Sequence, residues 1–197
     1  MDVNSINNNI SNLNNSTSLQ IDKTNQSNQI DKQDNNEINL SINEYNKKRD
    51  ELSLDVQSLN EGIAISRISQ NAIEKQKEFL VNVSDKLSNI ENYQDKNDVK
   101  AEINEQLRNF NQVAYETKFK NENLLVVNEY DENTTIEAST STSNFSLEKP
   151  NTAQIANDIF EIVNNYDLNK SENLNASITK VQSSYNQLQN TYEEFTE

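Results

Sequence analysis

The chain is almost without Gly and Pro, with one of each in 197 residues, and it contains no Cys, no His and no Trp. Gly and Pro build most tight turns, so their scarcity disfavours a fold of many short strands, whereas long helices need neither residue. Without Cys there is no disulfide or thiolate, and without His the commonest general base and metal ligand are missing. Paired carboxylates remain possible acids and bases, but 32 acidic residues on a helical protein are typical of solvated surface. We therefore expect no catalytic residue, metal, cofactor or small-molecule substrate.

Positive charge is also scarce, because 17 Lys and Arg stand against 32 Asp and Glu, for a net charge of −15. Nucleic acids and anionic membrane surfaces are bound through clustered basic residues, so both are disfavoured as partners. No apolar run is long enough to cross a bilayer, and no basic start with an apolar stretch marks a secretory signal.

Residues 1–40 form a polar segment rich in Asn, Ser and Gln, and its few hydrophobes are too dispersed to fill a core. Such a composition predicts a disordered tail. The simpler interpretation is a solvating tail, and the alternative is a tail that a partner or an export machine binds. The remaining residues, 41–197, are expected to form one helical domain.

The helical domain begins with two apolar runs at heptad spacing. Leu52, Val56, Leu59 and Ile63 follow a 4-3-4 spacing, and a longer run then continues from Ile65 to Ile90. The step from Ile63 to Ile65 breaks the phase of the repeat, and Gly62 beside it indicates close packing or a kink.

Two further helical segments follow. One is expected from about residue 99 to 118, with Asp98 as its N-cap, and the other begins near Pro150, weakens around 164–170 and ends in a regular heptad run. Three long apolar seams must be buried against each other. We therefore predict a mainly α fold, an elongated antiparallel bundle of three long helices, with a small β-hairpin closed at 131–133 and a loop over 138–150.

Three short motifs occur in a fixed order along this domain. They are Glu61-Gly62-Ile63, then Glu102-Ile103-Asn104 followed by Thr117, Phe119 and Leu124-Leu125, and finally Gln189-Asn190-Thr191-Tyr192-Glu193. This ordered set resembles the D1 core of bacterial flagellins over residues 50–197. Flagellins usually have Asn-Gly in the turn at Asn121, and Asn also tolerates the left-handed conformation that Gly supplies.

The resemblance implies a flagellin D1-like fold without the terminal D0 helices that build the filament tube, because the N-terminus is polar and the sequence ends just after the last motif. A flagellin-like core of this kind is similar to co-chaperones of the flagellin export chaperone FliS. The implied function is cytoplasmic binding to FliS before export, with flagellin as a second candidate partner. One alternative is a minor flagellin or hook-associated protein, exported without a cleaved signal peptide. Another is an unrelated coiled-coil or secreted effector.

Two sets of apolar residues are candidates for the contact with a partner protein. An apolar stripe at helical spacing normally packs inside, so core packing is the favoured interpretation of the first set, with an interface as the alternative. The second set precedes the matched region and lacks an obvious cover within the chain. The first set is Tyr185, Leu188, Tyr192 and Phe195, and the second is Leu52, Val56 and Leu59.

Overall fold

The computed structural model describes residues 32–127 and 134–196, and the chain divides into two units, residues 1–45 and residues 46–197. The described part of the first unit is helical and belongs to the start of α2 (Lys32–Ser88). Residues 1–31 of the predicted tail lie outside the described residues. The helix starts at Lys32 rather than after residue 40, because an established helix extends through Gln, Glu and Lys at little cost.

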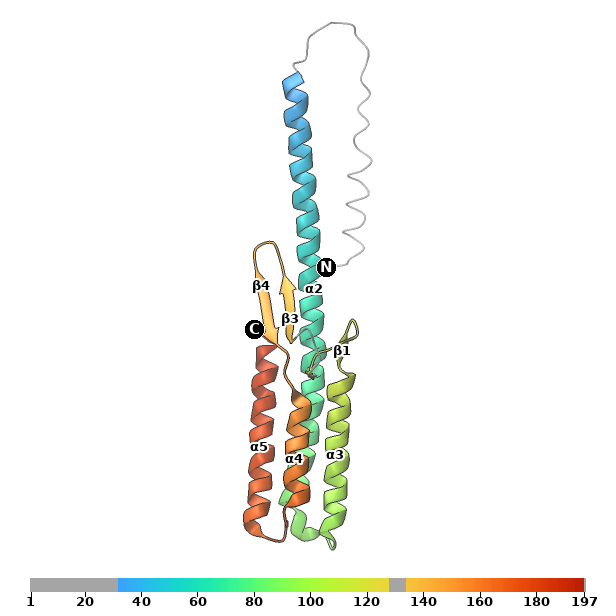
Figure 1. Cartoon of the computed structure of the whole chain (residues 1–197), viewed down its shortest axis with the longest axis vertical. Helices are drawn as coiled ribbons and strands as arrows, with labels where there is room; N and C mark the ends of the chain where they lie inside the picture. Colours follow the sequence, from blue (N-terminus) through green and yellow to red (C-terminus); the bar gives the residue numbers. More distant parts are fainter. Residues whose placement is uncertain (1–31, 128–133, 197) are drawn as a thin grey trace. The chain divides into compact units, whose positions relative to one another are not determined.

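The second unit, here called the bundle unit, is mostly helical. After α2 come a short 3₁₀ turn, η1 (Ile90–Asn92), and the helices α3 (Lys96–Glu116), α4 (Thr152–Asn165) and α5 (Ser171–Glu194) (Figure 1). Asp95, rather than Asp98, caps α3, because its carboxylate accepts a hydrogen bond from the Asn97 amide at 2.8 Å. The described residues thus contain four α-helices and not three.

The fourth helix arises because the predicted weak point at 164–170 is a complete break. Tyr166 is extended at the end of α4, and the Asp167 carboxylate accepts from the Asn169 amide at 3.0 Å in the turn that follows. Polar contacts show that successive helices run antiparallel. Gln106 and Glu102 of α3 meet Asn82 and Lys86 of α2, and Lys180 of α5 meets Asp158 of α4.

One hydrophobic core lies between the four helices of the bundle unit. Its largest fully buried side chains come from every helix and from the turn after α3. They are Ile73, Leu80, Leu87, Ile90, Ile103, Phe110, Leu125, Ile159 and Leu188. Burying large apolar side chains contributes about 1.5–3 kcal/mol each, which is the main force that holds the helices together.

The buried face of α5 differs slightly from the predicted heptad run. Small polar residues, Ser177, Ser184 and Thr191, lie along the centre of this face and are buried. Ser177 and Thr191 donate their hydroxyls to carbonyls one turn earlier, at 2.9 and 3.1 Å, so their burial is compensated. Because these residues are small, α5 packs closely, and the bulky residues beside them are placed at the margin of the core.

Two small antiparallel hairpins complete the bundle unit. The strands β1 (Lys118–Phe119) and β2 (Glu122–Asn123) are joined by Lys120 and Asn121, both with positive φ, 48° and 70°. This is the pattern of a type I′ turn, and it confirms the left-handed conformation expected at Asn121.

The second hairpin pairs β3 (Thr135–Ser139) with β4 (Asn144–Glu148). The predicted closing turn, residues 131–133, lies outside the described residues, and β3 pairs with the later strand β4 rather than with a strand before that turn. The prediction of a loop over 138–150 is wrong, because β4 occupies the middle of it. The Ser and Thr content suggested a loop, but the alternation of Phe145 and Leu147 with polar residues is a strand pattern, and Leu147 packs against the core.

Candidate protein-binding surface

Four apolar residues of α2 form a continuous exposed row, here called the apolar stripe. Leu52, Val56, Leu59 and Ile63 are 63%, 50%, 55% and 50% exposed. Their 4-3-4 spacing places them on one face of the helix. Isolated exposed hydrophobes are common, but a row of four on one helix face is typical of a surface that binds another protein. The second candidate set from the sequence therefore lies on the surface, and Ile63 belongs with it.

The phase break at Ile63–Ile65 explains why this stripe is exposed. After the break, the face of α2 that points into the core carries Ile65, Ser69 and Ala72. The same face, continued toward the N-terminus at the same spacing, carries Gly62 and Asp55, which lie against the β3–β4 hairpin. The apolar stripe is one residue out of step with this face, and one residue corresponds to a rotation of about 100°.

The hairpin is fixed to α2 by two contacts on the core-phase side. The Asp55 carboxylate accepts hydrogen bonds from the Ser141 amide at 2.7 Å and from the Ser141 hydroxyl at 2.6 Å. At Gly62, an added Cβ would lie 3.4 Å from the Cβ of Ala138. Of the two interpretations of Gly62, close packing is the one the structure shows, because α2 continues unbroken past it.

A groove of about 460 Å³ adjoins the lower end of the apolar stripe. Its apolar lining includes Leu59 and Ile63 of α2, Phe145 of the hairpin and Phe195 just after α5, and its polar lining includes Arg67 and Gln70. The groove therefore brings together Leu59 and Phe195, one residue from each candidate set. Apolar walls around an open groove fit the side chains of an amphipathic helix.

Charged residues beside the groove form one ion pair. Lys120, in the turn between β1 and β2, lies 2.6 Å from the Glu61 carboxylate. This hydrogen bond, assisted by one from Gln57, lowers the pKa of Glu61 below its ordinary value of 4.5. Glu61 is therefore ionised at neutral pH, and the rim beside Ile65 and Phe119 is polar.

The first candidate set lies mainly in the core. Leu188 is fully buried and Phe195 is nearly so, while Tyr185 and Tyr192 are half-buried and pack against the core. Lys77 of α2 is inserted between the two tyrosines, with its ammonium 5.3 Å from each ring centre. This position agrees with the favoured core interpretation, and a binding role for these four residues stays a prediction.

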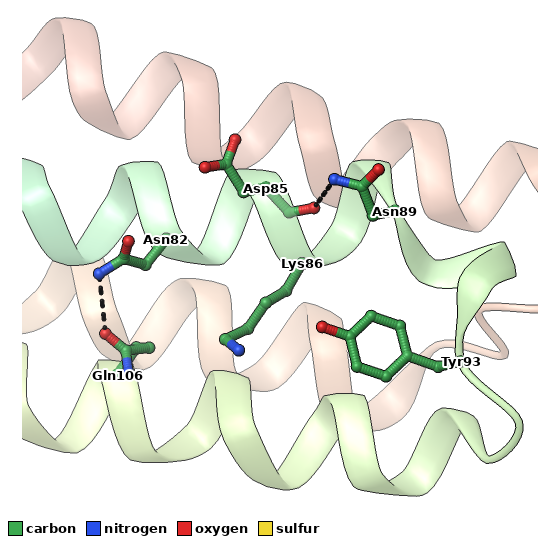
Figure 2. A pocket seen from close by; sticks show the side chains of 6 residues that line it. All are labelled: Asn82, Asp85, Lys86, Asn89, Tyr93 and Gln106. Atoms are coloured by element: carbon green, nitrogen blue, oxygen red, sulfur yellow. Dashed lines mark hydrogen bonds between the residues drawn. The ribbon is translucent and has the colours of Figure 1, made fainter.

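A polar hollow between α2 and α3 is lined by Asn82, Asp85, Lys86, Asn89, Tyr93 and Gln106. In Figure 2, Asn82 and Gln106 point toward one another, at 3.3 Å, and the Tyr93 hydroxyl points toward Lys86. Lys86 pairs with Glu102, and this hydrogen bond raises the pKa of Lys86 above 10.5. A lysine held in its charged form is a poor nucleophile and a poor base, and here Lys86 joins α2 to α3.

Among residues 32–127 and 134–196, no group of three acidic side chains is placed to hold a metal ion. Within the same ranges, no helix combines the length and the apolar character needed to cross a membrane.

No protein-family model matches the chain, and no curated protein matches it.

Sequence reasoning missed three residues of this region. Ile63 was assigned to the seam of the bundle rather than to the exposed set, although its spacing from Leu59 places it there. Phe145 was expected in a loop. Lys77 gave no signal in the sequence, because a buried lysine is recognised only from its surroundings.

Proposed function

We propose that this chain is a protein-binding co-chaperone of flagellar export, which binds the flagellin export chaperone FliS in the cytoplasm and assists the handling of flagellin. The observation that carries the binding role is the apolar stripe with its adjoining groove. Leu52, Val56 and Leu59 are each at least half exposed, and Phe145 adds an aromatic wall. A surface of this kind binds an apolar helix by helix-in-groove packing.

The choice of FliS as the partner rests on the flagellin-like motifs. Two features are compatible with the D1-like core that the resemblance implies. The segment from Thr117 to Leu125 forms a two-residue hairpin turn where flagellins have Asn-Gly, and the Gln189–Glu193 motif lies in α5. A helical bundle with a small hairpin on α2 is the architecture expected for such a core.

Calorimetric titration of the purified chain with purified FliS tests the proposal. We expect binding with a dissociation constant below about 10 µM, and Leu59→Asp should weaken it at least about tenfold, since the charge would have to be buried against apolar surface. Leu54→Asp is the matched control, because Leu54 is a similarly exposed leucine, at 66%, two positions from Leu52 and on the other side of α2.

Retained circular dichroism in both variants shows that the fold is intact. No heat of binding from two folded proteins would reject FliS as the partner. Equal loss in both variants would reject the stripe as the contact. The alternative, a minor flagellin or hook-associated protein, requires the chain on the cell surface, so its absence from sheared filaments by mass spectrometry would remove that alternative.

A further inference from the structure

The residue types in the apolar stripe match one kind of helix pair. In the heptad convention, Val56 and Ile63 occupy a positions, and Leu52 and Leu59 occupy d positions. β-branched residues at a with Leu at d favour two parallel helices over other coiled-coil states. The stripe is therefore not an unspecific apolar face.

The same register continues upstream in the sequence. Ile42 falls at an a position, and Ile38 and Tyr45 fall at d positions; all three are exposed. In each unit taken by itself, the heptad positions carry exposed residues, which packing within the described bundle does not explain. We propose that the apolar stripe of the bundle unit is covered by a second copy of the chain, in a parallel, in-register dimer.

The charge around the stripe permits this pairing. The chain as a whole carries −15, which opposes self-association. Residues 46–70, however, contain four basic and four acidic residues, so this segment has no net charge. The basic residues are Lys47, Lys48, Arg49 and Arg67, and the acidic ones are Asp50, Glu51, Asp55 and Glu61.

The positions that flank the seam also avoid repulsion. In a parallel pair, each residue just before an a position faces the residue five places later in the second copy. Lys48 then faces Ser53, and Asp55 faces Asn60, so the flanking positions bring no like charges together, and the one like-charged contact is Arg49 with Arg49 of the second copy. Arg49 is the polar residue at an a position, and its guanidinium bonds to the Asp50 carboxylate at 3.0 Å, which supplies the opposite charge. One polar a residue is a feature that fixes register.

Light scattering and sedimentation of the full chain alone, from about 1 to about 100 µM, measure the dimer. We expect twice the chain mass of 22.6 kDa at the upper end. Leu52→Asp should raise the dimer dissociation constant at least about tenfold, because the substitution acts in both copies. Leu54→Asp should leave it unchanged. A monomer throughout the range, or a dimer that Leu52→Asp does not weaken, would overturn the proposal.

Disulfide trapping then decides the direction of the two helices. The chain has no Cys, so each introduced Cys reports on one position. In a parallel, in-register pair, a Cys at position 52 faces the Cys at position 52 of the second copy, and a Cys at position 59 likewise faces position 59. Each pair then lies within the short Cβ separation that a disulfide needs. Both single variants should cross-link to themselves, and Leu54→Cys should not. In an antiparallel pair, d positions face a positions, so Leu52 would meet Ile63 of the second copy. Cross-linking only in a mixture of Leu52→Cys and Ile63→Cys would therefore contradict the proposal.

FliS and a second copy would cover the same stripe, so we expect FliS to bind the monomer, and the measurements of the dimer use the chain alone. A dimer without FliS binding would leave the inference standing and reject the proposed function. FliS binding by a chain that stays monomeric would support the proposed function and reject the inference.

Discussion

Gln76 connects three helices through its side-chain hydrogen bonds. It is fully buried in α2, and its amide nitrogen donates to the Phe110 carbonyl of α3 at 3.3 Å and to the Thr152 hydroxyl of α4 at 2.9 Å. Its amide oxygen is buried without a hydrogen-bond partner. Such an oxygen costs about 1–3 kcal/mol, so Gln76 orients the helices more than it stabilises them.

The first prediction concerns this site. Gln76→Leu keeps the volume, removes the unpartnered oxygen and leaves Thr152 donating to the Leu125 carbonyl at 3.2 Å. We expect the free energy of unfolding to change by less than about 1 kcal/mol or to rise. Gln76→Ala should lower it by about 2–4 kcal/mol because it opens a cavity. Urea denaturation compares the two variants, and equal losses would show that the hydrogen bonds, not the volume, carry the stability.

At the scale of elements, the β3–β4 hairpin approaches α2 closely at Gly62, which has no side chain. The second prediction is that Gly62→Ala raises the free energy of unfolding by up to about 1 kcal/mol, since Ala is the better helix former and its Cβ only touches Ala138. Gly62→Leu should instead displace the hairpin. Amide hydrogen exchange of Thr135–Ser139 measures this, with faster exchange expected in Gly62→Leu alone.

Asn60→Leu is the control for this experiment, because Asn60 is exposed on the same helix. If Gly62→Leu leaves the exchange of β3 unchanged, the hairpin does not depend on the close approach at Gly62.

The helices could be predicted from the sequence and the second hairpin could not, for a physical reason. Helical seams such as the one in α3, with Ile103, Leu107 and Phe110, repeat over many turns and give a strong signal. The strand β4 has only Phe145 and Leu147 to alternate, and both lie among Ser and Asn that equally suit a loop. Long-range contacts such as Asp55 with Ser141 leave no local trace.

For the whole molecule, three ion pairs shift pKa values and so contribute to the dependence of stability on pH. Lys180 lowers the pKa of Asp158 below 3.8, and Lys120 lowers that of Glu61 below 4.5. Both groups stabilise the fold above these ordinary values, and this stability is lost as the pH falls through the lowered ones. Glu102 raises the pKa of Lys86 above 10.5, so that its contribution is present below 10.5 and is lost at still higher pH.

The third prediction is therefore a plateau of stability from about pH 5 to about pH 10, measured by thermal unfolding. Asp158→Asn should lower the plateau slightly and flatten its acid side, because the group that titrates there has been removed. Glu161→Gln, at an exposed position of the same helix, should leave the shape unchanged. A variant Asp158→Asn with an unaltered acid side would show that other carboxylates control acid unfolding.

The candidate surface was only partly accessible to sequence reasoning. Heptad spacing marked Leu52, Val56 and Leu59, but spacing alone does not say whether a row of hydrophobes faces a core or the solvent. The C-terminal residues Leu188 and Phe195 gave a stronger pattern and are buried. Exposure was decided by which face of α2 the hairpin covers, and that information is absent from local periodicity.

Because the heptad register shifts by one residue between Ile63 and Ile65, the direction in which the apolar stripe faces depends on the number of residues at this point as well as on their types. One inserted residue at this point would turn the upstream row by about 100° toward the strands and bring Ile63 into the place of Gly62. Since an added Cβ there already lies 3.4 Å from the Cβ of Ala138, the insertion would bury the row only by pushing the strands away.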